Sequence, residues 1–234
     1  MTAQLKESLS DKGWEMKPPG FVRFNLEELT AEFERAYAKG VTESGYENVA
    51  SLSTQDIAEL PAIAAMFEDV RKHMQEISPA LQFEELWLVS TKEGNIHPDV
   101  VPFVPHIDKH RYLKAMIYLD DVGEYDGPFT VASCAPSLND ALRKTFGPDY
   151  KERRQNVIEM LPRSAYKPCT GQAGSIIFFD TNCPHFAGHV RGGGKRRVFR
   201  FDFTKRAWNP VPVRSRLVRA LRKAFSMFGG AVRH

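Results

Sequence analysis

The chain has 234 residues, of which 42% are hydrophobic and 26% charged, the composition of an ordinary globular protein with one well-buried domain. It has no run of eighteen apolar residues, which argues against a membrane-spanning helix, and the polar stretch Met1–Lys17 lacks the pattern of a secretory signal. Three scattered cysteines (Cys134, Cys169 and Cys183) indicate neither a disulfide framework nor a zinc site. These features predict a cytoplasmic protein.

The net charge of +3 conceals a basic C-terminal segment. Residues 205–234 carry eight basic residues and no acid, which leaves 24 Lys and Arg against 29 Asp and Glu in the remainder. A local basic segment on an acidic body does not indicate nucleic-acid binding. Arg214–Phe228 has apolar residues near helical spacing, and we expect a helix docked on its own domain. A helix on a membrane surface is the alternative.

The first third of the chain predicts helices. Asn25 is a suitable cap for a helix that runs to about Lys39. A second helical stretch follows Ser53-Thr54, and Pro61 is expected to restart it before Ile63–Ile77. We therefore assign residues 1–80 as a helical N-terminal support.

From Leu81 onward the sequence predicts short strands separated by turns. The strand candidates are Glu85–Ser90, Leu113–Leu119, Gly127–Val131, Ser175–Phe179 and Arg197–Phe203. A charged insertion over residues 137–159 has a helical pattern. Helices followed by many strands predict a single, mainly β domain, a barrel or jelly roll buttressed by N-terminal helices. Its core would be residues 81–204 and its basic tail residues 205–234.

His106 and Asp108 form a candidate pair of metal ligands. Residues two apart on an extended strand point the same way, so both side chains can reach one ion. A second His-x-Asp triplet, His97 to Asp99, is discounted because Pro98 imposes a turn and no strand follows it.

A third ligand is expected after the strand Ser175–Phe179, where His185 and His189 stand four residues apart. Either histidine would complete the set of two imidazoles and one carboxylate that holds non-haem Fe(II). An arginine in the following basic stretch can bind the distant carboxylate of a co-substrate. Strand alternation leaves Arg196 and Arg197 both open, because they point to opposite faces.

The order of these motifs resembles the phytanoyl-CoA dioxygenase family, a branch of the Fe(II)/2-oxoglutarate-dependent oxygenases. The matching pieces are His106–Asp108, the strand 113–122, the turn Asp126–Gly127–Pro128 and the strand Gly174–Phe179 leading to His185. The resemblance covers residues 81–203. It implies a double-stranded β-helix, the cupin-like form of the jelly roll, with the metal at one open end.

The resemblance also implies roles for individual residues. The family places its distal histidine eleven residues after the strand glycine and its 2-oxoglutarate arginine eleven residues later, which selects His185 and Arg196. Arg197 remains the second candidate, and Lys114 the next. Iron would be held by His106, Asp108 and His185, with 2-oxoglutarate and O2 as co-substrates.

The implied function is a dioxygenase that hydroxylates or otherwise oxidises a C–H bond of a small or medium metabolite, with release of succinate and CO2. A carboxylate at Asp108 argues against halogenation, for which related enzymes carry a small residue there. Ala132–Ser137 departs from the family pattern beside the substrate region, so the family's usual substrates are not carried over. The alternative is a catalytically silent jelly roll that serves as a binding or sensor protein.

Overall fold

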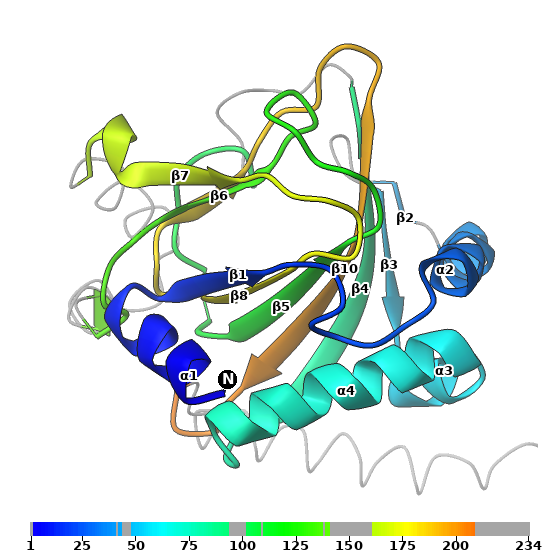
Figure 1. The fold of residues 1–234 in the computed structure, drawn as a ribbon, viewed down its shortest axis with the longest axis horizontal. Helices are drawn as coiled ribbons and strands as arrows, with labels where there is room; N and C mark the ends of the chain where they lie inside the picture. Colours follow the sequence, from blue (N-terminus) through cyan, green and yellow to red (C-terminus); the bar gives the residue numbers. More distant parts are fainter. Residues whose placement is uncertain are drawn as a thin grey trace, which may run out of the picture.

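Two antiparallel sheets face each other in the structure, a computed structural model that describes residues 2–40, 42–43, 48–93, 102–108, 110–137, 139–140 and 161–208 (Figure 1). The helices are α1 (Thr2–Asp11), α2 (Leu26–Gly40), α3 (Thr54–Ala58) and α4 (Pro61–Ile77). The strands are β1 (Trp14–Lys17), β2 (Thr42–Glu43), β3 (Asn48–Leu52), β4 (Gln82–Lys92), β5 (Leu113–Tyr118), β6 (Phe129–Ala132), β7 (Tyr166–Cys169), β8 (Ile176–Asp180), β9 (His185–Ala187) and β10 (Lys195–Thr204).

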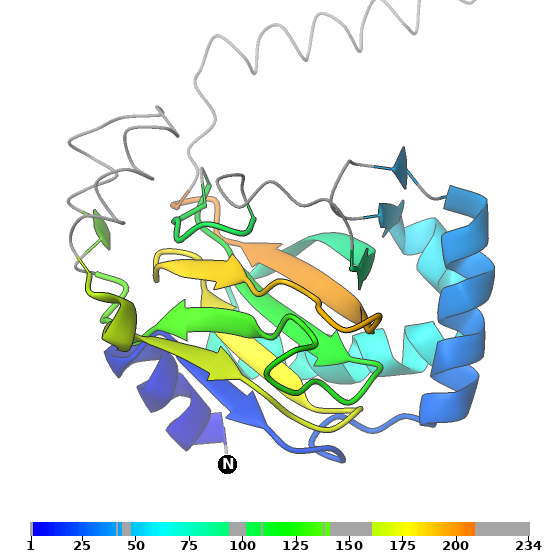
Figure 2. The same ribbon diagram turned by 90° about the horizontal axis from the view of Figure 1, so that it is seen from above.

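The large sheet has the strand order β1-β8-β5-β10-β4-β3-β2 and the small sheet the order β7-β6-β9. An isolated bridge between His106 and His185 ties the segment before β5 to the small sheet. This arrangement is the predicted mainly β, jelly-roll architecture with N-terminal helices. Figure 2 shows α2 and α4 on the side of the large sheet that faces away from the small one.

The phenylalanines of β10 point toward the helices and away from the space between the sheets. Phe199 meets Phe33 of α2 with ring centroids 5.3 Å apart, and Phe201 stacks near Phe67 of α4 at 6.2 Å. All four rings belong to one buried cluster shared by the sheet and the helices. Because side chains alternate along a strand, the other set of β10 residues faces the space between the sheets.

The predicted helices of the first third are confirmed, with their expected ends. Asn25 Oδ1 accepts hydrogen bonds from the backbone N–H groups of Glu27 and Glu28 at the start of α2. Ser53 forms a reciprocal cap with Asp56 at the start of α3, and α4 begins at Pro61. Proline suits a first helical position because its missing N–H would have no partner there.

Residues 1–80, assigned from the sequence as a helical N-terminal support, contribute strands to the large sheet as well as helices. β1 pairs with β8, and β3 pairs with β4. Both strands are four or five residues long and mix polar with apolar side chains, so their pattern is weak. His73 of α4 is half-buried, and its ring stacks on that of Phe21 with centroids 4.6 Å apart.

Three predictions fall outside the described residues. They are most of the charged insertion, the discounted pair His97 and Asp99, and the basic helix over Arg214–Phe228. Among the residues that the structure does describe, no helix combines the length and the apolar character needed to cross a membrane.

Candidate metal centre

The three predicted ligands meet in one place. The backbone N–H of His106 donates to the carbonyl of His185 over 3.0 Å, and the N–H of His185 donates back over 2.9 Å. The Nε2 atoms of His106 and His185 lie 3.6 and 3.5 Å from Oδ1 of Asp108. The three ligand atoms all lie within 4.8 Å of one another, so a single ion can contact all of them.

Backbone carbonyls orient both imidazole rings. Nδ1 of His106 lies 2.7 Å from the carbonyl oxygen of Val104, and Nδ1 of His185 lies 2.8 Å from that of Cys183. A carbonyl only accepts, so each Nδ1 carries the proton and each Nε2 presents a lone pair toward Asp108. This donor set fits an Fe(II) ion bound on one face, with further coordination positions left for other ligands.

The surroundings of His185 and Asp108 favour the protonation states that can bind a cation. Burial lowers the pKa of His185, and the neighbouring His106 adds to this effect, so the ring stays neutral. Burial alone would raise the pKa of Asp108, but the charge of the neighbouring Lys114 opposes this effect, and the pKa is held well below its usual value. Metal binding therefore requires no proton to leave these groups at neutral pH.

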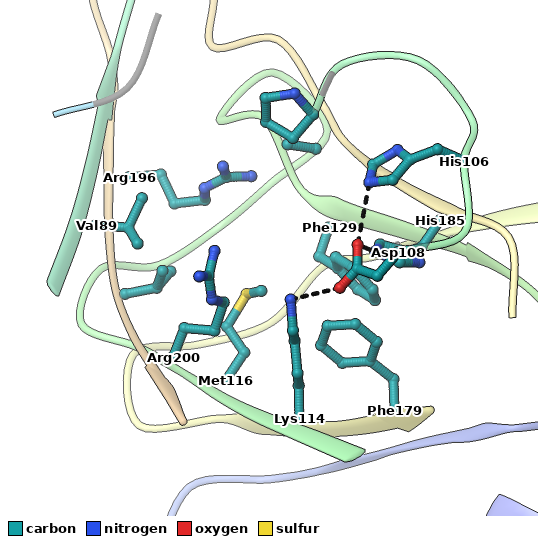
Figure 3. A pocket seen from close by; sticks show the side chains of 13 residues that line it. Val89, His106, Asp108, Lys114, Met116, Phe129, Phe179, His185, Arg196 and Arg200 are labelled. Carbon is teal, nitrogen blue, oxygen red and sulfur yellow. Dashed lines mark hydrogen bonds and ion pairs between the residues drawn. The ribbon is translucent and has the colours of Figure 1, made fainter. Parts of the chain in front are cut away.

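Lys114 belongs to this centre, although the sequence suggested it only as a reserve partner for the co-substrate. Its Nζ lies 2.7 Å from Oδ2 of Asp108 and 3.9 Å from Oδ2 of Asp202 (Figure 3). One oxygen of Asp108 therefore faces the histidines while the other binds the lysine. The signal for this role was a single charged residue within the otherwise apolar strand β5, which is buried throughout.

A cavity of about 280 Å³ opens beside the ligands, between the two sheets. Its wall combines apolar side chains with three cations: Val89, Met116, Phe129, Phe179, Val198, Lys114, Arg196 and Arg200. This volume lies near the lower end for small-molecule sites, which are mostly apolar with a few placed polar groups.

Arg196 is buried in the wall of this cavity. Its Nη1 donates to the carbonyl oxygen of Gly127, and its Nη2 lies 3.2 Å from Oγ1 of Thr91. Gly127 has a φ of 68°, and a Cβ atom there would come within 2.6 Å of the carbonyl oxygen of Gly188. The glycine of the Asp-Gly-Pro turn thus lets the backbone approach closely enough to receive the guanidinium.

Arg197 points to the opposite face of β10. Its Nη1 lies 2.6 Å from Oε1 of Glu34 in α2, and its Nε lies 3.1 Å from Oδ2 of Asp120. The pair with Glu34 attaches β10 to the helical layer, and the pair with Asp120 ties β10 to the segment that follows β5. Arg196, and not Arg197, shares a cavity with the three candidate ligands.

His189 lies outside the ligand cluster. Its ring stacks on Phe103 with centroids 4.9 Å apart, and burial lowers its pKa, with Arg191 adding to the effect. The set of side chains that can share an ion consists of His106, Asp108 and His185 among the described residues.

The sequence model of the phytanoyl-CoA dioxygenase (PhyH) family matches residues 25–198. The chain belongs to this family. The predicted family is therefore confirmed, and with it the class of non-haem iron, 2-oxoglutarate-dependent enzymes to which the site's donor set points. No curated protein sequence gives a significant match.

Several solved structures of such enzymes share the fold. The carbocyclase SnoK of nogalamycin biosynthesis has a TM-score of 0.67 at 14% identity, over 88% of this chain and 84% of its own. The epimerase SnoN, solved with Fe³⁺, α-ketoglutarate and nogalamycin RO, has a TM-score of 0.61 at 18% identity, over 87% and 83%. HygX from Streptomyces hygroscopicus, solved with nickel, 2-oxoglutarate and hygromycin B, has a TM-score of 0.58 at 15% identity, over 88% of each chain.

Replacing Lys114 with methionine should destabilise the metal-free protein, because Asp108 would lose its cationic partner. Breaking a buried ion pair costs roughly 3–5 kcal/mol, and we expect about 3 kcal/mol because the Asp108 side chain is 18% exposed. Urea unfolding with and without Mn(II) measures the effect. Added metal should reduce the difference from wild type, since the ion replaces the lysine as counter-charge to Asp108.

Lys167→Met, at an exposed position on β7, is the matched control and should change stability by less than about 0.5 kcal/mol. An equal loss with and without Mn(II), or no loss at all in Lys114→Met, would contradict the pairing.

Proposed function

We propose that the protein is an Fe(II)/2-oxoglutarate-dependent dioxygenase that oxidises a C–H bond of a small or medium metabolite, with release of succinate and CO2. The observation that carries the proposal is the placement of His106, Asp108 and His185 around one point in a cavity that also contains a buried arginine. Family membership supports the same class.

The residues of this chain hold and orient the reactants. His106 and His185 bind iron through Nε2, since their Nδ1 atoms are fixed by backbone carbonyls. Asp108 binds through Oδ1 while Lys114 holds Oδ2, which favours one-oxygen coordination. When bound, iron and 2-oxoglutarate supply the oxidising power for attack on a C–H bond, and the protein supplies position and protection.

Arg196 is proposed to bind the distal carboxylate of 2-oxoglutarate. A guanidinium offers a planar pair of N–H donors that matches a carboxylate, and Thr91 places a hydroxyl beside it. Val198 and Phe129 line the same cavity and reduce its hydration. A charge-assisted contact is stronger where water is excluded.

The substrate is proposed to be a small molecule. SnoN and HygX, which share this fold, were each solved with a natural product bound. The proteins that share this fold include an epimerase and a carbocyclase, which supports a site able to give more than one kind of product. We propose hydroxylation as the reaction, with desaturation and ring closure as variants that the same site can support.

A catalytically silent jelly roll is the competing function. A silent protein would not need a complete set of metal ligands. Here three candidate ligands, the backbone carbonyls that orient the two imidazoles and an arginine in the cavity are all present. Formation of succinate from 2-oxoglutarate in the presence of Fe(II), O2 and a metabolite panel separates the two functions. A protein that binds both cofactors but never consumes 2-oxoglutarate under these conditions would be the silent form.

Anaerobic titration with Fe(II) and 2-oxoglutarate should produce the visible charge-transfer band of this enzyme class. His185→Ala removes a ligand and should weaken iron binding by more than about 100-fold, since even loss of a residue that merely supports a ligand costs roughly 10–100-fold. His189→Ala is the matched control and should leave the band intact, because that ring packs on Phe103. The reverse pattern would show that the distal ligand is assigned to the wrong histidine.

Arg196→Met should raise the dissociation constant of 2-oxoglutarate at least tenfold in the same anaerobic titration. Truncating one partner of a buried charge pair costs roughly 2–5 kcal/mol, and each 1.4 kcal/mol is a factor of ten. Arg197→Met should leave the affinity for 2-oxoglutarate within about twofold and should instead lower stability, because its partners are Glu34 and Asp120. Equal, small effects on affinity would mean that neither arginine holds the carboxylate.

A further inference from the structure

Arg200 is a second arginine in the cavity of the metal centre, and the proposed function gives it no role. It lies on the same face of β10 as Arg196, four residues further along. Figure 3 shows its guanidinium directed into the cavity beside Met116, its register partner on β5. Four residues of extended strand span about 13 Å, so the two arginines can serve different parts of the cavity.

The guanidinium of Arg200 is anchored on two sides. Its Nε lies 3.2 Å from Oδ1 of Asp202 and its Nη2 lies 3.5 Å from Oδ2. Its plane lies over the ring of Trp87, with the central carbon 5.2 Å from the ring centroid. An arginine held in this way loses little further conformational freedom when it binds a planar anion, which favours recognition.

The charges of the cavity favour an additional anion. Three cations line the wall: Lys114, Arg196 and Arg200. Two carboxylates lie against them: Asp108 and Asp202. Among these described groups the charges sum to +1, and bound Fe(II) and 2-oxoglutarate, whose charges cancel, leave that sum unchanged. Glu85, opposite Asp202 in register, is half-buried outside the cavity lining, and burial raises the pKa of its carboxyl.

We infer that Arg200 binds a carboxylate of the substrate and thereby positions the substrate beside the metal. The inference rests on the proposed function, because 2-oxoglutarate then occupies Arg196 and leaves Arg200 for the second ligand. A single excess charge and a planar guanidinium match a monocarboxylate better than a dianionic phosphate ester. The substrate class is therefore a small carboxylic acid with a C–H bond within reach of the iron.

The test begins with the anaerobic Fe(II) protein and 2-oxoglutarate alone. Arg200→Met keeps the length of the side chain and removes its charge. We expect its dissociation constant for 2-oxoglutarate to stay within about twofold of the wild-type value, unlike that of Arg196→Met. Lys195→Met, at an exposed position on the same strand, controls for the loss of one positive charge. Absence of the charge-transfer band in the wild-type protein at this stage would overturn the proposed function, and this inference with it.

The second stage adds a panel of matched small molecules to the protein saturated with Fe(II) and 2-oxoglutarate. The panel pairs linear, branched and aromatic monocarboxylic acids with their amides, and binding is measured by equilibrium dialysis and by the change in the charge-transfer band. We expect the wild-type protein to bind at least one acid roughly tenfold or more tightly than the matching amide. A difference of this size corresponds to one charge-assisted contact. Arg200→Met should abolish this preference, and Lys195→Met should keep it.

Three results, two from the second stage and one from the first, would overturn the inference while leaving the proposed function intact. One is equal binding of acids and amides by the wild-type protein, including no binding of either. Another is an acid preference that survives in Arg200→Met. The third is a loss of 2-oxoglutarate affinity in Arg200→Met as large as in Arg196→Met, which would assign Arg200 to the co-substrate.

Discussion

The alternation of side chains along β10 is the constraint on which the arrangement of this protein depends. β10 lies between β5 and β4 near the middle of the large sheet, so each of its faces must be satisfied by a different layer. Phe199 and Phe201 pack on the helices, while Arg196 and Arg200 enter the cavity. A register shift of one residue would bury arginines under the helices and expose phenylalanines to the metal site.

The metal centre depends in turn on the junction between the two sheets. His106 and His185 exchange two backbone hydrogen bonds, so the two candidate histidine ligands are fixed to each other by the pairing of the chain itself. Asp108 lies two residues after His106, and Nζ of Lys114 on β5 binds Oδ2 of Asp108. The ligands therefore derive their positions from sheet pairing and a buried ion pair, and metal binding needs little reorganisation of the chain.

Local patterns predicted much of the fold. The caps at Asn25 and Ser53, the long apolar strands and the His106-x-Asp108 pair are short-range signals, and the structure contains each of these features. It also brings His185 beside that pair, while the role of the three side chains as iron ligands stays a prediction. The sequence missed β1 and β3, because a strand of four or five residues that mixes polar and apolar side chains is defined mainly by the partner it pairs with. The alternation of side chains along β10 could be recognised in the sequence. It did not show which of the two sets faces the helices, because alternation alone does not say which face of the sheet they cover.

The residues that complete the site were the hardest to predict. Lys114 and Arg200 carry no motif, and their proposed roles rest on their position in the cavity and on ion pairs with Asp108 and Asp202 that form only after folding. One charged side chain in a buried apolar strand was the only local hint for Lys114. The choice between Arg196 and Arg197 needed either a family spacing or the tertiary structure, because both are basic residues of the same strand.

The most direct test of the account is the location of iron in crystals grown without oxygen in the presence of Fe(II) and 2-oxoglutarate, by anomalous scattering at the iron edge. The account predicts one iron peak at bonding distance, roughly 2.0–2.2 Å, from Nε2 of His106, Nε2 of His185 and Oδ1 of Asp108. Density for 2-oxoglutarate should extend from that peak to Arg196. An iron peak bound by other side chains, or 2-oxoglutarate directed away from Arg196, would contradict it.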